Sequence, residues 1–462
     1  MKKFKFSLYI ALSCLITATA LFFKLSLFKS SIIFIFLASI FGSLFYWEYR
    51  LGFMFIGSAL FLLIGAVTPE DFIRFASLEV ILFLISMMIV VGMMKDAGLF
   101  EWMLRLILRI KKLTGRKLFL YLMFFSAIFS ALMGEVASIM IMIVTILQIS
   151  ELLEIDPVPL VFSSIIATNI GSAATVLGNP VGILIATHSG LSFEDFLFHA
   201  LPNSMINLMG SILLLLFVYR RYVTDIHYRL KEYTENQGFL QLITISSERK
   251  TRISIVIFCV TIFLISLHKR FELLLNLQEN TLLLMFPILS AGIVLMYCHE
   301  KARSYIENEI EWPSIIFFMF LFAQAGVIKA TGVAQLLAKQ ISDFAQVPQM
   351  LIGIILFTGG ILSSVLDNVI AVAAYIPLIQ ELQLLSEENS NFWWALLFGA
   401  CYGGNITMIG STANIVALGL LEKNMDIKVT FIQWLKIGFI VGIINLLLTF
   451  ILLTIHIQKF HF

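Results

Sequence analysis

Long apolar runs separated by short polar connectors dominate the chain. A membrane-spanning helix needs about 20 apolar residues. The runs that approach or exceed this length are 7–23, 31–46, 51–67, 78–94, 158–187, 197–219, 251–267, 281–298, 312–330, 392–421 and 430–455. The first run follows three lysines, but no clean cleavage site comes after it, so we interpret it as a retained span and not a signal peptide. The pattern predicts an all-α polytopic membrane protein with about eleven transmembrane helices.

Two further apolar stretches, 118–149 and 347–380, are too long for one ordinary crossing. The first would measure about 48 Å as a straight helix, against a hydrocarbon core of about 30 Å. If both turn back as re-entrant hairpins, the first near Gly134, then 23 of the 31 Lys and Arg fall on one side of the membrane. The positive-inside rule therefore favours two hairpins, a cytoplasmic N-terminus and an outside C-terminus. Two amphipathic stretches, 98–113 and 332–345, are predicted to lie in the membrane interface.

The composition agrees with this pattern. Hydrophobic residues make up 60% of the chain and charged residues 13%, with a mean hydropathy of +0.97, which excludes a soluble globular protein. A net charge of +2 gives no indication of nucleic-acid binding. The four cysteines show no metal-ligand spacing and are interpreted as packing residues: Cys14, Cys259, Cys298 and Cys401. We expect a multi-pass protein of the cell membrane, in contact with lipid.

The two halves of the chain resemble each other at a nearly fixed offset. Segment 80–98 matches 314–332, and 133–139 matches 366–372. The third match places Gly171, Thr175 and Gly178 on residues 232 positions later: Gly403, Thr407 and Gly410. Five predicted crossings separate the starts of the two copies, so the second copy is inverted in the membrane. The predicted organisation is N-terminal spans (1–50), a first inverted repeat (51–219), a cytoplasmic linker (220–250), and a second repeat with its preceding span (251–455). Inverted repeats are typical of secondary transporters.

One helix in each repeat is predicted to be broken near the middle of the membrane. Nine of the fifteen residues in 168–182, and eight of the twelve in 403–414, are Gly, Asn, Thr, Ser or Pro. Unwound backbone at membrane depth is tolerated where it is buried in protein or lines a cavity. The alternative interpretation is close packing of small residues between helices. The candidate binding residues at the breaks are Asn169, Gly171, Thr175, Gly178, Asn179, Gly403, Asn405, Thr407, Gly410, Ser411 and Asn414.

Each predicted hairpin carries one acidic residue deep in an apolar stretch. These are Glu135 and Asp367, and Asn368 follows the second. A charge at membrane depth costs several kcal/mol, so such a residue is usually functional or paired. Burial would favour the protonated form, whereas a bound Na⁺ would favour the carboxylate. Both residues are therefore candidates for binding a coupling cation; the alternative is that wet hairpin tips merely solvate them.

The chain resembles the ion transporter superfamily, which contains arsenite permeases, citrate transporters, sodium/proton antiporters of the D type and sodium/dicarboxylate cotransporters. The resemblance rests on Leu366-Asp367-Asn368 with Pro377, on 167–180, and on 393–414, and it covers about 50–455. It implies eleven spans, two hairpins whose tips join two broken helices in the substrate and cation sites, and a homodimer. The first tip reads Gly134-Glu135 where an Asp-Asn or Ser-Asn-Thr type of motif is usual, which is closer to the arsenite/citrate-like branch.

The function predicted from these features is secondary active transport of a small anion, such as a carboxylate or oxyanion, coupled to H⁺ or Na⁺. The alternative is a Na⁺/H⁺ antiporter, in which the same carboxylates exchange cations. A membrane-embedded enzyme is a weaker alternative, because no hydrolase, metalloprotease or nucleotide-binding motif is present. A channel is a further alternative, which ohmic current in place of saturable turnover would reveal. We expect no organic cofactor, no resident metal beyond a coupling Na⁺, and no nucleic-acid partner.

Overall fold

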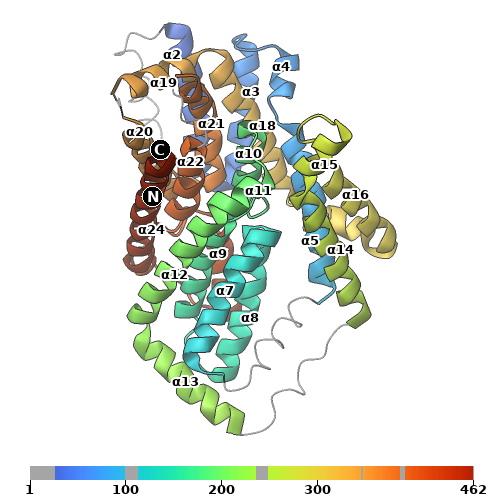
Figure 1. The fold of residues 1–462 in the computed structure, drawn as a ribbon, viewed down its shortest axis with the longest axis vertical. Coiled ribbons are helices and arrows are strands. Elements are labelled where there is room, and N and C mark those ends of the chain that lie inside the picture. Colours follow the sequence, from blue (N-terminus) through green and yellow to red (C-terminus); the bar gives the residue numbers. More distant parts are fainter. Residues whose placement is uncertain (1–25, 99–112, 236–247, 345–346, 386–390, 461–462) are drawn as a thin grey trace. The chain divides into compact units, whose positions relative to one another are not determined.

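The computed structural model describes residues 26–98, 113–235, 248–344, 347–385 and 391–460, and within these ranges the regular elements are all helices (Figure 1). The predicted span 7–23 and most of the amphipathic stretch 98–113 lie outside the described residues. The helices of the first half are α2 (Leu27–Phe45), α3 (Arg50–Leu63), α4 (Pro69–Arg74), α5 (Leu78–Asp96), α7 (Gly115–Met133), α8 (Glu135–Leu153), α9 (Val158–Ser172), α10 (Pro180–Ser189), α11 (Phe193–Asp195), α12 (Leu201–Val218) and α13 (Arg220–Glu235).

The second half continues the same pattern of long helices joined by short connectors. Its helices are α14 (Glu248–Ser266), α15 (His268–Leu275), α16 (Thr281–Tyr297), α17 (Ala302–Ser304), α18 (Trp312–Ala330), α19 (Val333–Phe344), α20 (Pro348–Val365), α21 (Asn368–Leu385), α22 (Asn391–Gly403), α23 (Thr412–Met425) and α24 (Phe431–Phe460).

The described residues form two compact units, and each unit draws on both halves of the sequence. One unit comprises the described parts of 1–85, 311–352 and 370–393; the other comprises those of 86–310, 353–369 and 394–462. In the first unit, α2 packs along α3, and both contact α18. The buried side chain of Gln324 in α18 donates hydrogen bonds to the Met54 carbonyl (3.0 Å) and the Ser58 hydroxyl (3.1 Å) of α3.

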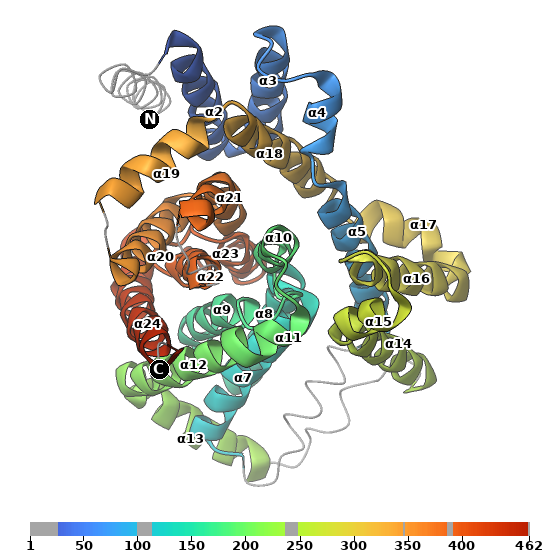
Figure 2. The same ribbon diagram turned by 45° about the horizontal axis from the view of Figure 1, so that its top comes forward.

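The second unit is built around the pair α7 and α8. The connector between these helices is the single residue Gly134, whose φ of +88° favours glycine. Helix α9 lies against both arms, and α12 lies against α9 and α24, as Figures 1 and 2 show. A buried hydrogen bond of 2.8 Å between Ser126 and Ser164 joins α7 to α9.

The predicted hairpin turn at Gly134 is confirmed, and a second turn at Leu366 and Asp367 separates α20 from α21. The four arms have 18 or 19 residues each, which is about 27–28 Å of helix. Length alone therefore does not distinguish a re-entrant arm from a crossing one. A hairpin nevertheless returns the chain to its starting side, whatever depth it reaches. The number of crossings between the two repeats therefore stays odd, and the second repeat stays inverted.

Both predicted helix breaks are present. Helix α9 ends at Ser172 and α10 begins at Pro180, while α22 ends at Gly403 and α23 begins at Thr412. A polar residue often precedes a helix and caps its first amides, and proline is common at the first helical position. Asn179 caps α10 by accepting a hydrogen bond from the Gly182 amide, and Pro180 follows it. Ser411 caps α23 by accepting a hydrogen bond from the Ala413 amide.

Three local features differ from the sequence-based expectation. The predicted linker 220–250 begins with a 16-residue helix, α13, because Val223, Ile226 and Leu230 recur at helical spacing and are buried. The spans near 251–267 and 281–298 each continue into a second helix, after bends of 58° and 98°. Within the stretch 332–345, residues 333–344 form α19, and the interfacial position of this stretch stays a prediction.

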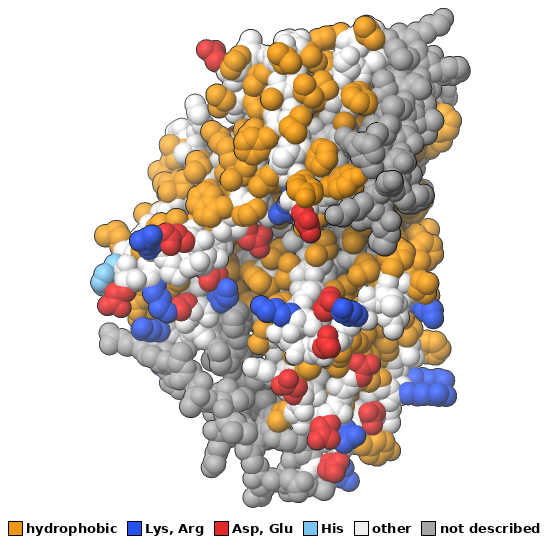
Figure 3. Space-filling view, turned by 180° about the vertical axis from the view of Figure 1, so that it is seen from behind, with side chains coloured by type: hydrophobic (Ala, Val, Ile, Leu, Met, Phe, Trp, Pro, Cys, Tyr) orange, Lys and Arg blue, Asp and Glu red, His pale blue; other side chains and the backbone are white. Residues whose placement is uncertain are grey.

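The chain is a multi-pass integral membrane protein. The described residues contain nine helices long and apolar enough to cross a membrane, or up to eleven if each bent pair is one span. Many large apolar side chains are exposed, among them Phe217 at 70% and Met296 at 81%. Figure 3 shows wide continuous areas of hydrophobic side chains on the surface, which suit lipid and not water.

Candidate functional site

The two acidic hairpin tips come together in the second unit. Asn368, the first residue of α21, donates its side-chain amide to both carboxylate oxygens of Glu135, at 3.2 and 3.1 Å. Glu135 is the first residue of α8 and is 3% exposed. The side chains of Ser172 and Asn179, from the first break, also face this carboxylate, and Asp367 lies close enough to repel it. In the described part of the chain no ion pair joins Glu135 to a Lys, Arg or His.

Asp367 is held differently from Glu135. One of its carboxylate oxygens accepts a hydrogen bond from the Val369 amide at 3.0 Å. The other accepts from the Thr412 amide at 3.1 Å and from the Thr412 hydroxyl. Because Thr412 is the first residue of α23, this carboxylate lies at a helix N-terminus, where the helix dipole favours a negative charge. The second hairpin tip is therefore attached to the second break.

The first break surrounds Asn179. Its side-chain amide donates to the Ser172 hydroxyl at 3.0 Å and to the Cys401 sulfur at 3.1 Å. Cys401 belongs to α22 of the other repeat and is 1% exposed. Gly178 lies so close to α9 that a Cβ added to it would approach the Ser172 carbonyl carbon to 2.7 Å. Sequence reasoning did not single out Ser172 or Cys401. The first lies within the polar run 168–182, whereas nothing in the sequence separates Cys401 from a packing cysteine.

A network of asparagines holds the second break. Asn169 of α9 donates to the side-chain oxygens of Asn405 and Asn414, both at 2.8 Å. Asn414 in turn donates to the backbone carbonyls of Gly404 (2.8 Å) and Thr407 (3.0 Å). Within the described residues, the Asn169 side-chain oxygen and the Asn405 side-chain nitrogen are buried with no hydrogen-bond partner. These atoms are a donor and an acceptor that a polar solute or water could satisfy.

Equivalent contacts recur in the two repeats. The Thr175 hydroxyl donates to the Ala131 carbonyl of α7, and the Thr407 hydroxyl donates to the Ser364 carbonyl of α20. The two threonines are 232 residues apart and the two acceptors 233 apart. This agreement of side-chain contacts supports the internal duplication, because helices similar by chance would not repeat the same hydrogen bond.

Close contacts between helices, at glycine residues, also recur in the two repeats. A Cβ added to Gly171 would lie 2.5 Å from the Cα of Ala127, and one added to Gly403 would lie 2.7 Å from the carbonyl carbon of Gly360. Within the second break, a Cβ added to Gly410 would lie 2.8 Å from the carbonyl oxygen of Gly404. The glycines that the sequence suggested as binding residues thus have a packing role here, which was the alternative interpretation. The two interpretations are compatible, because close packing brings the broken segments to the hairpins.

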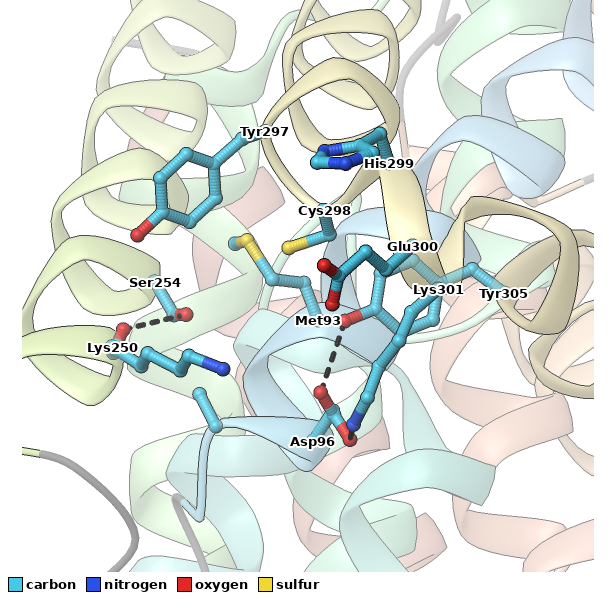
Figure 4. Close-up of a pocket in the computed structure, with 11 residues that line it drawn as sticks. Met93, Asp96, Lys250, Ser254, Tyr297, Cys298, His299, Glu300, Lys301 and Tyr305 are labelled. Carbon is cyan, nitrogen blue, oxygen red and sulfur yellow. Dashed lines mark hydrogen bonds and ion pairs between the residues drawn. The ribbon is translucent and has the colours of Figure 1, made fainter.

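A separate pocket of about 280 Å³ lies where α5, α14 and α16 end or begin (Figure 4). Asp96 accepts hydrogen bonds there from Lys301 and from the Tyr305 hydroxyl (3.2 Å). The pocket lining carries both signs of charge and includes none of the candidate site residues: Met93, Asp96, Ala97, Lys250, Ser254, Tyr297, Cys298, His299, Glu300, Lys301 and Tyr305.

Paired broken helices and two hairpins that meet at buried carboxylates define a secondary-transporter type of architecture. The sequence model of a family described as citrate transporter matches residues 44–399, and the chain belongs to this family. The family, within the ion transporter superfamily, and the names of the relatives indicate a transporter and not an enzyme.

Two relatives of known sequence agree with this assignment, and a solved structure shows a similar fold. A protein of Mycobacterium tuberculosis named as an uncharacterized transporter is 26% identical over 382 residues, covering 80% of this chain and 84% of the relative. A Synechocystis protein with the same kind of name is 22% identical over 410 residues, covering 83% and 88%. The crystal structure of the YdaH transporter of Alcanivorax borkumensis, reported to have an unusual topology, has a TM-score of 0.60 at 15% identity and covers 87% of this chain and 89% of its own. That last similarity concerns the fold alone.

Proposed function

We propose that this protein is a secondary active permease that moves a small anion, such as a carboxylate or oxyanion, coupled to H⁺ or Na⁺. The observation that carries the proposal is the contact between Glu135 and Asn368 beside the first break. Two carboxylates lie near each other there, and Glu135 has no basic partner among the described residues. An anion approaching the site is repelled until a cation binds, so binding of the two is coupled.

A second candidate, a Na⁺/H⁺ antiporter, has support from the same electrostatics. The site contains two acidic groups, and no Lys or Arg is seen to pair with Glu135 in the described ranges. A site of this charge suits a cation even if no anion follows. The family description favours the anion permease, because citrate is an anion.

The proposal extends to the setting of the protein. We infer that it lies in the cell membrane with its N-terminus in the cytoplasm and its C-terminus outside, on the Lys and Arg distribution. A homodimer is proposed on the superfamily resemblance alone.

Proteoliposomes test the function. The purified chain should accumulate citrate or another small carboxylate when a proton or sodium gradient is imposed, and Asp367→Ala should abolish this uptake. Gradient-driven transport that is unchanged in Asp367→Ala would count against the proposal. Sodium-dependent proton movement detected by a pH-sensitive dye, without any anion, would favour the antiporter.

A further inference from the structure

The two breaks share a backbone turn but differ in the side chain that contacts its carbonyls. Gly404, Thr407 and Asn414 of the second break correspond, 232 residues earlier, to Ser172, Thr175 and Gly182 of the first. The turns match bond for bond: the Gly178 amide donates to the Thr175 carbonyl at 3.3 Å, as the Gly410 amide does to the Thr407 carbonyl. The breaks therefore present the same pair of carbonyls.

The side chain at the position of Asn414 and Gly182 decides what those carbonyls bind. Asn414 places its amide nitrogen 2.8 Å from the Gly404 oxygen and 3.0 Å from the Thr407 oxygen. Its counterpart Gly182 has no side chain. A Cβ added to Gly182 would lie 2.8 Å from the Val176 carbonyl oxygen and 3.0 Å from that of Thr175, so the first break leaves no ordinary space for such a side chain.

The Ser172 and Thr175 carbonyls of the first break consequently lack the side-chain donor that Asn414 provides in the second. The Ser172 carbonyl accepts no backbone hydrogen bond among the loop and turn contacts of the described residues. The Thr175 carbonyl accepts only from Gly178 in the same set. Nearby, the Glu135 carboxylate faces the Ser172 and Asn179 side chains. Unwound carbonyls beside a carboxylate are the usual ligands of a coupling cation in transporters built from broken helices.

The carboxylate at the second break already has hydrogen-bond donors. Asp367 accepts hydrogen bonds from the amide and the hydroxyl of Thr412 at the start of α23, and a third from the Val369 amide. A cation is therefore not required to satisfy either the carboxylate or the Gly404 and Thr407 carbonyls. An amide N–H₂ supplies two donors, which suits two carbonyls.

We propose that Asn414 is a built-in substitute for a cation: its amide nitrogen fills the cation position of the second break, so that this break binds none. Any coupling cation is then confined to the first break, and each chain binds at most one. This inference rests on the proposed cation coupling and sets its stoichiometry, with Asn414 as the residue that determines it.

The test is Asn414→Asp in the full-length purified protein. Aspartate keeps the oxygen that accepts from Asn169 and removes only the donor nitrogen. The new carboxylate and the two carbonyls then form an oxygen-lined position that needs a cation. We expect the melting temperature of the variant to rise by a few degrees when Na⁺ replaces choline at fixed ionic strength, beyond any rise in the wild type.

Asn445→Asp is the matched control. Asn445 is as buried as Asn414, both at 0% exposure, and its side-chain oxygen also accepts a hydrogen bond, from Ser211. This variant should show no added Na⁺ stabilisation, since no pair of break carbonyls faces it. An equal gain in both variants, or no gain in Asn414→Asp, would overturn the proposal.

A second measurement does not depend on either variant folding. Equilibrium binding of radioactive Na⁺ to the wild-type protein should give no more than one ion per chain, whereas two ions would overturn the inference. Both readouts measure cation binding without transport. A failure to move any anion would therefore refute the proposed permease. The role of Asn414 would still be decided by the two cation-binding measurements.

Discussion

Asn368 and Glu135 occupy equivalent positions of the two repeats, 233 residues apart, and they are hydrogen-bonded to each other. Residues that an inverted duplication makes equivalent meet where the two copies face each other. The pair has diverged, so that one copy supplies a carboxylate and the other supplies the amide that holds it. Because of this divergence, Glu135 is the only carboxylate of the pair.

Glu135→Gln should uncouple transport without unfolding the protein. Glutamine keeps an oxygen that accepts from Asn368 but carries no charge to be neutralised by H⁺ or Na⁺. Gradient-driven uptake should fall by about tenfold or more, equivalent to ~1.4 kcal/mol per tenfold, in proteoliposomes matched for protein content. Glu272→Gln is the control, because Glu272 is also buried but accepts hydrogen bonds from the Asn280 and Leu282 amides at the start of α16. Full coupled uptake in Glu135→Gln would remove this residue from the coupling mechanism.

Gly403→Ala should destabilise the protein through one methyl group. The added carbon would lie 2.7 Å from the carbonyl carbon of Gly360, and backbone cannot move aside as a flexible side chain can. We expect a loss of about 1–3 kcal/mol from overpacking. Gly419→Ala in α23 is the matched control, since nothing lies within 4 Å of its added Cβ; it should be neutral or stabilising by up to ~1 kcal/mol. Thermal unfolding in detergent distinguishes them, and equal melting temperatures for the two variants would contradict the packing argument.

Local backbone chemistry explains what could be predicted from the sequence. Gly134 marks the hairpin turn because glycine permits its positive φ, and Asn179-Pro180 marks where the helix resumes after the first break, because asparagine caps a helix and proline suits its first position. The turn and the break depend on residues within a few positions of each other. The offset of the repeats follows instead from the comparison of distant segments, in which glycines and threonines keep register.

Contacts between distant segments were not predictable in the same way. No local pattern shows that Cys401 lies beside Asn179, or that Asn414 reaches back to the Gly404 carbonyl. Helix α13 differs from the prediction for another reason: the polarity of 220–250 indicates a linker, although Val223, Ile226 and Leu230 give its first part an apolar stripe.

Cys401 reports whether water reaches the site. Its sulfur accepts a hydrogen bond from Asn179 in the first break and is 1% exposed, so a folded, closed chain should protect it. In a background with Cys14, Cys259 and Cys298 changed to serine, a small water-soluble thiol reagent should label Cys401 slowly. Saturating coupling cation or substrate should change that rate by stabilising one conformation. Labelling as fast as that of a small free thiol in solution, or a rate that no transported solute changes, would show that this cysteine does not lie on the transport pathway.

The proposed orientation can be tested at two exposed positions of the second unit. Tyr228 lies in α13 at 66% exposure and Leu274 in α15 at 77%. The Lys and Arg distribution predicts that 220–252 is cytoplasmic, and one crossing then puts residue 274 outside. In a cysteine-free background, Leu274→Cys should react with an impermeant maleimide in intact cells, and Tyr228→Cys only after permeabilisation. The reverse labelling pattern would mean that the protein has the opposite orientation in the membrane. Labelling of both cysteines in intact cells would mean that α14 does not cross the membrane. An inverted protein would keep the two antiparallel repeats, because their relation depends on the number of crossings between them and not on which side is the cytoplasm.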